Sequence, residues 1–166
     1  MFPIKREIKL RDIPDANRWG AQRRFDIHTG VDLFCPEGEP VYAVEDGEVT
    51  TVCYFTGPEV DMPWWNTTMA VAVEGYNGVI LYGEIEPANG ITPGSSVKEG
   101  DLIGHVIQVL KKDKGKPRTM LHIELYESGY RGNWDFWKER EVLPPGLKNI
   151  ETLLFTESVG TNDPIM

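Results

Sequence analysis

The chain has 166 residues, a formal net charge of -9 at pH 7 and 40% hydrophobic residues. This size is typical of one domain with a buried core, so we expect residues 1–166 to form a single domain. The negative charge argues against binding to nucleic acid. No apolar run is long enough to span a membrane, and the N-terminus lacks the apolar stretch of a signal peptide, which predicts a cytoplasmic location for the chain as given.

Glycine and proline residues separate short apolar runs along the chain, a pattern typical of many short strands. Strands are expected over residues 41–44, 49–52, 69–73, 79–82, 102–107 and 120–126. The first two runs flank an Asp-Gly turn at residues 45–48, and the next two flank residues 74–78, which end in Asn-Gly. Each of these two pairs therefore predicts a hairpin.

The rest of the chain shows weaker patterns. Residues 1–19 are expected to be an irregular lead-in, and residues 157–166 a polar tail. Short helices are predicted over residues 135–142 and 149–155. The run from Phe55 to Thr68, with two prolines, predicts a long surface loop. The two cysteines, Cys35 and Cys53, are predicted to be unlinked buried thiols. The predicted fold is mainly β, an antiparallel sheet or sandwich with few helices.

The predicted strand over residues 120–126 has side chains that alternate between two faces. One face is apolar and predicted to fill the core: Leu121, Ile123 and Leu125. The opposite face carries Met120, His122, Glu124 and Tyr126. A histidine on the non-core face of a strand is available to a ligand. Glu124, one strand step further, is predicted to lie at the rim of such a site or to contact one of its ligands, rather than to be a ligand.

His28, Asp32 and His122 together suit a zinc ion. Gly30 disfavours a helix between the first two, so a turn that leads into a strand is expected, with Val31 and Leu33 pointing away from Asp32. Zinc takes imidazole nitrogens and carboxylate oxygens, and three protein ligands leave a position open for catalysis. On spacing alone, however, the pattern favours an Asp that stabilises a turn and two ordinary polar histidines over a metal site.

The surroundings of these residues resemble the lysostaphin/LytM-type zinc endopeptidases, which cut peptide cross-links in bacterial peptidoglycan. The main match is RFDIHTGVDLFCPEGEPVYAVEDGEV, residues 24–49. Three further segments match in order: VILYG at 79–83, GSSVKEGDLIG at 94–104 and LHIEL at 121–125. Residues 144–147 (PPGL) and 150–154 resemble the closing segment of the family. The resemblance covers about residues 20–155.

The resemblance implies a small antiparallel β domain with a groove over the sheet and a zinc ion held by His28, Asp32 and His122. It also identifies two departures. The family has two further histidines that assist the reaction, and at these positions the chain has Glu84 and Met120. The ligand positions therefore match the family, whereas both catalytic histidine positions do not.

Met120 cannot exchange a proton at neutral pH. For Glu84 three interpretations remain: a fourth zinc ligand that closes the site, a general base for a hydrolytic reaction, or a solvated edge residue. His105, the third histidine, is predicted to be structural. Trp64 and Trp65 either line a groove for a peptide or glycan or anchor the long loop.

Three functions are compatible with this sequence. The first is a zinc-binding peptidase-like domain with weak or no peptidoglycan endopeptidase activity, which acts in binding or regulation. The second is an active zinc endopeptidase that uses Glu84 as its base. The third is an interaction module without metal. The expected cofactor is Zn²⁺, and the expected partner is a peptide of peptidoglycan or another protein.

Overall fold

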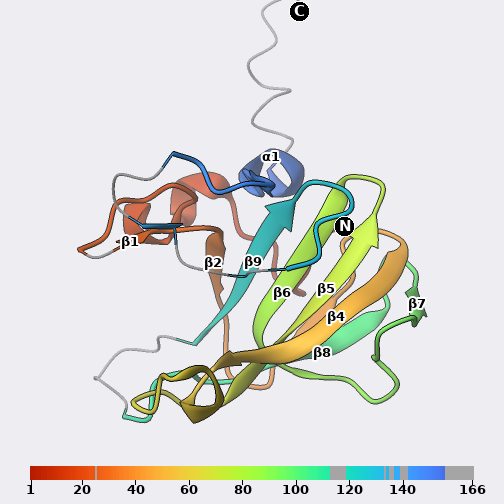
Figure 1. Ribbon diagram of the computed structural model, residues 1–166, viewed down its shortest axis with the longest axis horizontal. Coiled ribbons are helices and arrows are strands. Elements are labelled where there is room, and N and C mark those ends of the chain that lie inside the picture. Colours follow the sequence, from red (N-terminus) through yellow and green to blue (C-terminus); the bar gives the residue numbers. More distant parts are fainter. Residues whose placement is uncertain (25, 113–118, 133, 135–136, 139–141, 156–166) are drawn as a thin grey trace, which may run out of the picture.

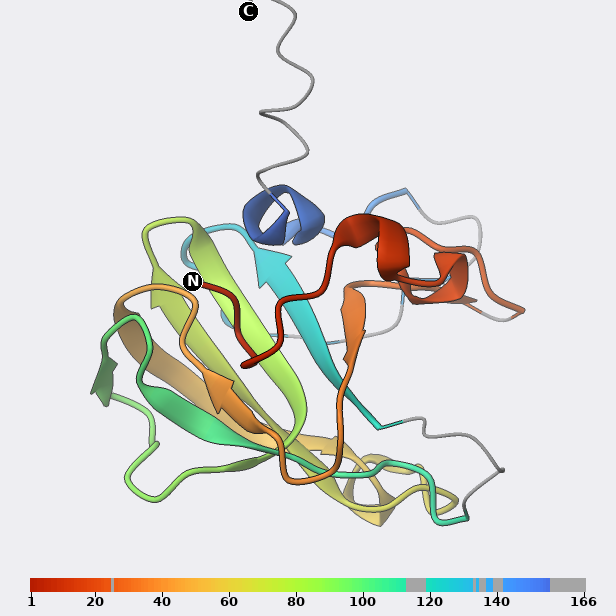
Figure 2. The same cartoon turned by 180° about the vertical axis from the view of Figure 1, so that it is seen from behind.

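The computed structural model describes residues 1–24, 26–112, 119–132, 134, 137–138 and 142–155. The fold is built on antiparallel strands (Figures 1 and 2), and the prediction of a mainly β protein is confirmed. The strands are β1 (Asp26–Ile27), β2 (Val31–Phe34), β3 (Pro40–Tyr42), β4 (Gly47–Thr56), β5 (Thr68–Gly75), β6 (Gly78–Pro87), β7 (Ser96–Val97), β8 (Leu102–Val106), β9 (Met120–Tyr126), β10 (Trp137–Lys138) and β11 (Leu147–Lys148). The helices are η1 (Leu10–Asp12), η2 (Asp15–Asn17), η3 (Pro58–Val60) and α1 (Glu151–Leu154).

Nine of these strands form one sheet, in which β11, β9, β6, β5, β4 and β7 lie in this order. Strand β2 pairs with β9, β3 pairs with β8, and β8 pairs with β6. Strands β1 and β10 form a separate two-stranded sheet. The long strand β6 changes partner along its length: it pairs with β9 as far as Gly83 and with β8 from Ile85 onward.

The predicted hairpin over residues 69–82 is confirmed, because β5 and β6 pair from end to end across the turn at Tyr76 and Asn77. The predicted hairpin at residues 45–48 is wrong. Strand β3 pairs with β8, and β4 pairs with β5 and β7. The Glu45 carboxylate accepts hydrogen bonds from the backbone N–H and the side-chain amide of Asn77. The turn is thus fastened to the tip of the β5–β6 hairpin instead of joining its own flanking strands.

Of the two helices predicted near the C-terminus, one is confirmed and one is wrong. A short helix is found within residues 149–155, as expected. The predicted helix over residues 135–142 is wrong where the chain is described, since Trp137 and Lys138 form strand β10 opposite β1. The indole of Trp137 packs on that of Trp19, with ring centroids 5.4 Å apart. The predicted polar tail, residues 157–166, lies outside the described residues.

Two apolar clusters lie on opposite faces of the sheet. The main core contains Leu121, Ile123 and Leu125 together with Val31 and Leu33, as the alternation predicts. The second cluster contains Ala70, Ala72, Val79, Leu81, Tyr126 and Leu147, against which Phe55, Tyr130, Trp134 and Trp137 pack. His122 and Glu124 are on the second face, so this face of the sheet carries the candidate site.

The structure also bears on the predictions for the cysteines, for membrane spans and for the N-terminal lead-in. Both cysteines are free, as expected, but they are only partly buried, contrary to the prediction of buried thiols. Desolvation raises the pKa of the Cys35 thiol to about 12. Among the described residues, no helix has the length and apolar character needed to cross a membrane. The lead-in, residues 1–19, contains only the 3-10 helices η1 and η2.

The lead-in is fastened to α1 by a partly buried ion pair. The Arg18 guanidinium donates to both oxygens of Glu151 at 2.8 Å, and the backbone N–H of Trp19 donates to the same carboxylate at 2.8 Å. Figure 2 shows the resulting contact between the N-terminal segment and α1 at one end of the sheet. Residues on either side of Arg18 reach the candidate site, so this contact helps to position them.

We expect Glu151→Gln to lower the free energy of unfolding by about 1–3 kcal/mol, because a charged acceptor of three hydrogen bonds is replaced by a neutral one. Urea denaturation measures the change. Glu7→Gln is the control, since Glu7 is exposed, and its effect should stay within about 0.5 kcal/mol. Equal effects of the two substitutions would show that the Arg18–Glu151 contact contributes nothing.

Candidate metal centre and groove

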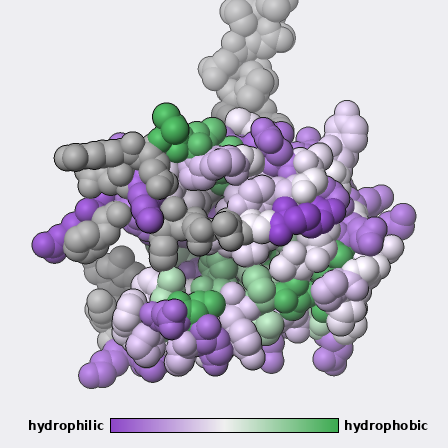
Figure 3. All heavy atoms as spheres, viewed as in Figure 1, coloured by the Kyte–Doolittle hydropathy of each residue, from purple (hydrophilic) through white to green (hydrophobic). Residues whose placement is uncertain are grey.

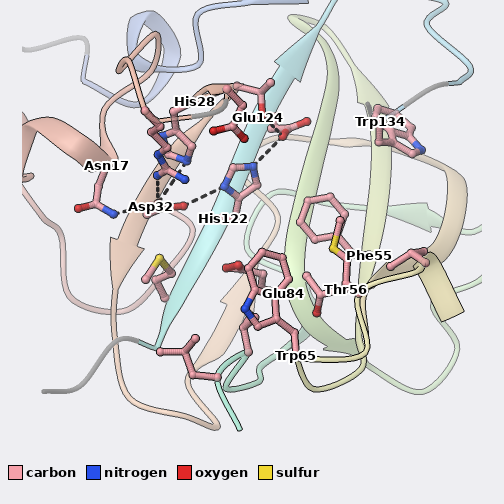
Figure 4. A pocket seen from close by; sticks show the side chains of 18 of the residues that line it. Asn17, His28, Asp32, Phe55, Thr56, Trp65, Glu84, His122, Glu124 and Trp134 are labelled. Atoms are coloured by element: carbon pink, nitrogen blue, oxygen red, sulfur yellow. Dashed lines mark hydrogen bonds and ion pairs between the residues drawn. The ribbon is translucent and has the colours of Figure 1, made fainter. Parts of the chain in front are cut away.

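Three buried side chains converge on the second face of the sheet: His28, Asp32 and His122. Asp32 in β2 lies directly opposite His122 in β9, and His28 is supplied by the turn between β1 and β2. One ligand atom from each lies within 4.8 Å of the others. The structure therefore brings together the three residues that the sequence selects as metal ligands (Figure 4).

The proton on His28 is fixed by the backbone. Its Nδ1 lies 3.0 Å from the carbonyl oxygen of Arg18. Because a carbonyl oxygen only accepts, Nδ1 carries the hydrogen and Nε2 presents its lone pair. That Nε2 lies 3.2 Å from Oδ2 of Asp32. Two lone pairs at this distance require a positive charge between them, either a proton or a metal ion.

His122 is held on both sides by carboxylates. Its Nδ1 lies 2.8 Å from Oδ1 of Asp32, and its Nε2 lies 2.6 Å from Oε2 of Glu124. Glu124 also accepts hydrogen bonds from Thr29 at 2.5 Å and from Tyr126 at 2.6 Å. A carboxylate behind a ligating histidine fixes the ring and increases its basicity, an arrangement typical of protein metal sites.

The electrostatics are dominated by these contacts. Burial opposes the charged form of Asp32, but hydrogen bonds from His122 and His28 outweigh it and hold the pKa of Asp32 below its usual range. Burial likewise opposes the imidazolium of His122, yet Asp32 and Glu124 raise its pKa well above the usual value. Asn17 and Arg23 add donors to Oδ2 of Asp32, at 2.9 and 3.3 Å.

This donor set fits a zinc ion. Two imidazole nitrogens and one carboxylate oxygen are the ligands that zinc prefers, and three protein ligands are typical of catalytic rather than closed structural sites. His28, Asp32 and His122 would hold the ion, and Glu124 and the Arg18 carbonyl would orient the two imidazoles. Glu84, the fourth candidate, does not join the group of atoms within 4.8 Å.

Gly30 is required where the ligand turn crosses β9. A Cβ atom built at this position would lie 2.2 Å from the backbone oxygen of Ile123 and 2.9 Å from Cγ of Glu124. Real Cβ atoms are not found so close to a backbone oxygen. Any side chain at position 30 would therefore push the turn away from β9 and separate His28 from His122.

A pocket of about 690 Å³ opens beside the three ligands. Its polar lining includes Asn17, Arg23, Thr29, Thr56, Glu84 and Glu124. Its apolar lining includes Tyr54, Phe55, Val60, Met62, Trp65, Val109, Leu110, Met120 and Trp134. The surface in Figure 3 shows hydrophobic side chains gathered over the lower middle of the molecule, with hydrophilic side chains around them. The site is thus an apolar groove with charged groups at its base.

Glu84 occupies an unusual place in the sheet. It is left over as a bulge between Gly83, which pairs with His122, and Ile85, which pairs with Val106. Its φ of 64° is in the left-handed region, which side chains other than glycine seldom adopt. Its Oε2 is buried and has no hydrogen-bond partner among the residues that the structure describes. Burial, reinforced by the charge of Asp32, raises the pKa of Glu84 to about 8.

The other residues selected from the sequence lie at different distances from this centre. Met120 and Trp65 line the pocket. Trp64 does not line it; its side chain is 61% exposed and packs edge-on against Trp65. His105 is exposed on β8, opposite Pro40 and Glu86, and takes no part in the pocket.

Comparison with known proteins agrees with this arrangement. The sequence profile of peptidase family M23 matches residues 26–134, well over half of the chain. The chain belongs to peptidase family M23. The match runs from just before His28 to beyond His122 and so includes all three ligand positions. The resemblance to the LytM-type zinc endopeptidases is therefore confirmed at the level of the family, whose members are zinc-dependent hydrolases that act on peptidoglycan.

Solved structures share the fold at low sequence identity. The structure of cbpa from L. salivarius REN is 18% identical with a TM-score of 0.55, over 90% of each chain. LytU is 18% identical with a TM-score of 0.53, over 82% of this chain and 79% of its own. Csd3 of Helicobacter pylori is 20% identical with a TM-score of 0.50, over 96% of this chain and 39% of its own. No curated protein sequence matches the chain.

Several residues that surround the ligands in this M23 domain are not identified from the sequence. Asn17 and Arg23 come from the lead-in and its continuation, and Thr29 follows the first ligand. Only Tyr126 carried a usable signal, because it alternates with His122 and Glu124 on one face of β9. The others reach the site through long-range packing, which local patterns do not encode.

We expect Gly30→Ala to reduce zinc affinity more than 100-fold and to destabilise the fold, because the added Cβ overlaps the backbone of β9. Zinc binding is measured by competition with a chelator. Gly132→Ala is the matched control, since a Cβ there meets no atom within 4 Å. Normal zinc binding by Gly30→Ala would contradict the close approach of the ligand turn to β9.

We expect Glu124→Gln to weaken zinc binding by about 10–100-fold, the usual cost of losing a carboxylate behind a ligating histidine. Its shape is kept, so the fold should remain. The same chelator competition measures the effect, with Glu127→Gln, an exposed neighbour, as control. Unchanged affinity in Glu124→Gln would mean that Thr29 and Tyr126 hold a residue with no influence on the metal.

Proposed function

We propose that this chain is a zinc-binding M23 domain that holds a peptide in its groove and has weak or no peptidoglycan endopeptidase activity. One observation carries the proposal. The chain has three histidines; His28 and His122 belong to the ligand set, and His105 lies outside the pocket. No imidazole is left to exchange protons with a substrate.

The residue that lines the pocket at one of the lost positions supports this view. Met120 is a thioether without an exchangeable proton, so it offers the pocket an apolar surface only. A positioned acid–base group typically contributes about 10²–10⁴-fold to a rate. Loss of two such groups without replacement would leave a hydrolase far below the usual activity of zinc enzymes.

The groove itself remains suited to binding. A bound zinc ion would supply a Lewis acid that polarises a peptide carbonyl. Around it, Phe55, Met62 and Trp65 provide apolar surface, and Arg23 provides a donor at the edge. These features support recognition of a peptide, from peptidoglycan or from a protein partner, in a binding or regulatory role.

A second candidate function is active hydrolysis with Glu84 as the general base. The buried, unpartnered Oε2 of Glu84 favours it, because the carboxylate lines the pocket and has no structural partner there. A pKa raised to about 8 also makes this carboxylate a stronger base than an ordinary one. On this hypothesis Glu84→Gln abolishes cleavage but leaves zinc bound. Absence of cleavage of any peptide in a library between pH 5 and 9 removes it.

The main proposal is tested by restoring the two histidines. Glu84→His combined with Met120→His should produce measurable cleavage of peptidoglycan cross-bridges or oligoglycine, at least 100-fold above the unmodified protein. Histidine tolerates the left-handed backbone at position 84 better than most residues. Peptide release is followed by mass spectrometry after the zinc content has been measured.

The control carries Asp32→Asn in addition to the two histidines and should lose the gained activity, since a ligand has been removed. Strong activity in the unmodified protein would overturn the proposal. Absence of stoichiometric zinc in the purified protein would overturn its metal-binding half and leave an interaction module.

A further inference from the structure

The three candidate metal ligands do not explain the carboxyl group of Glu84, which lies outside their group. The bulge lies where β6 leaves β9 and joins β8, so residue 84 pairs with neither strand. A left-handed backbone there costs about 1–2 kcal/mol for a residue with a side chain. Burial of the Oε2 atom, which has no hydrogen-bond partner among the described residues, adds a further cost. Two such costs at one pocket residue indicate a ligand that is bound there.

Within the described part of the chain, no cation forms an ion pair or hydrogen bond with Oε2 of Glu84. Arg23, which also lines the pocket, is engaged by the carbonyl of Ala16 and by Oδ2 of Asp32. Among the described residues, none donates a hydrogen bond to Oε2 of Glu84. Among the described residues Oε2 thus leaves a place for a donor, which a group of a bound ligand can occupy.

We propose that Glu84 recognises a primary ammonium group, carried at the end of an aliphatic arm by the peptide that occupies the groove. This inference rests on the proposed function, because it assumes that a peptide is held beside the three metal ligands. It assigns the substituted catalytic position a new role in selectivity: the carboxylate selects a cationic ligand, where a neutral histidine would not.

The walls of the pocket fit the rest of such an arm. Phe55, Trp65 and Met120 line the same pocket as Glu84, and Figure 4 shows Trp65 and Phe55 on the side of His122 where Glu84 lies. Methylene groups pack on such apolar walls while a charged end reaches its partner. Aromatic faces also attract an ammonium group when water is excluded.

Charge favours a cation over the alternatives. Glu84 is not among the atoms that could ligate one metal ion with His28, Asp32 and His122 in this arrangement. Glu124, a second buried carboxylate, lies on the same side of the sheet, and the chain has a formal net charge of -9. The field of the molecule thus attracts a cationic peptide and repels an anionic one.

The test is calorimetric titration of the zinc-loaded protein with three alanine-based pentapeptides. The first has blocked termini and a central lysine, the second has Nε-acetyllysine in its place, and the third has no lysine but a free N-terminal amine. We expect the lysine peptide to bind at least about tenfold more tightly than the acetylated one. In Glu84→Gln this preference should disappear, with zinc content unchanged.

Glu86→Gln is the matched control, because Glu86 is exposed on the same strand two residues further on, and it should keep the preference. Preference for the third peptide instead of the first would support the ammonium site and identify an amino terminus as its source. Equal binding of lysine and acetyllysine peptides, no binding of any of the three, or a preference that survives Glu84→Gln would overturn the proposal.

Failure of the proposed function is seen separately in the same samples. Mass spectrometry of the peptides after titration detects cleavage, and metal analysis detects loss of zinc. Cleavage with an intact, Glu84-dependent lysine preference would overturn the weak-activity proposal and leave the ammonium site standing. Intact peptides that show no Glu84-dependent preference for lysine would overturn the ammonium site and leave the weak-activity proposal standing.

Discussion

The pairing of Asp32 with His122 across β2 and β9 is the constraint on which the site depends. These residues are 90 positions apart, and their side chains meet only because the two strands pair in one register. A slip by one residue would turn Asp32 to the other face of β2 and present Val31 or Leu33 to His122. Register is secured by burial, since Val31 and Leu33 have no exposed surface in the main core. The metal centre is therefore a consequence of core packing on the opposite face.

The same site places charged side chains in the protein interior, where their removal from water costs free energy. Asp32 and Glu124 are both buried, and each is surrounded by donors that come from different parts of the chain. Desolvation of these carboxylates is offset only while the imidazoles between them carry positive charge or share a cation. A divalent ion satisfies this requirement, and the requirement does not involve residues 84 and 120. This requirement is therefore the same whichever residues occupy positions 84 and 120.

The correct sequence predictions depend on two local signals. One is the alternation of side chains between the two faces of a strand, and the other is a turn that joins two neighbouring strands into one hairpin. The two faces of β9 follow from strict alternation, and the β5–β6 hairpin follows from its Asn-Gly turn, so His122 and Glu124 could be placed on the ligand face in advance. The ligand set itself needed the family resemblance, because spacing alone favoured ordinary polar residues.

The failures have a common physical origin. The Asp-Gly turn at residues 45–48 has good local chemistry, but β3 gains more from β8 than from β4, and Glu45 binds Asn77 instead. Asn17 and Arg23 reach Asp32 because Arg18 is fastened to Glu151, a contact across 133 residues. Strand partners and side chains delivered over such separations are set by tertiary packing, which a local pattern does not contain.

The bulge at Glu84 shows why a lost catalytic position need not become a neutral one. Residue 84 has no paired residue in β8 or β9, because β6 changes partner there, and its side chain lines the pocket. Its backbone is held in a left-handed conformation by the sheet on either side. Replacement by an apolar residue would have removed the buried charge at no cost to strand pairing. A carboxylate instead places a negative group within a groove whose walls are apolar, where electrostatic interactions are stronger than in water. Under the proposed function, this position discriminates between ligands by charge, in place of the proton transfer that the family resemblance implies for a histidine.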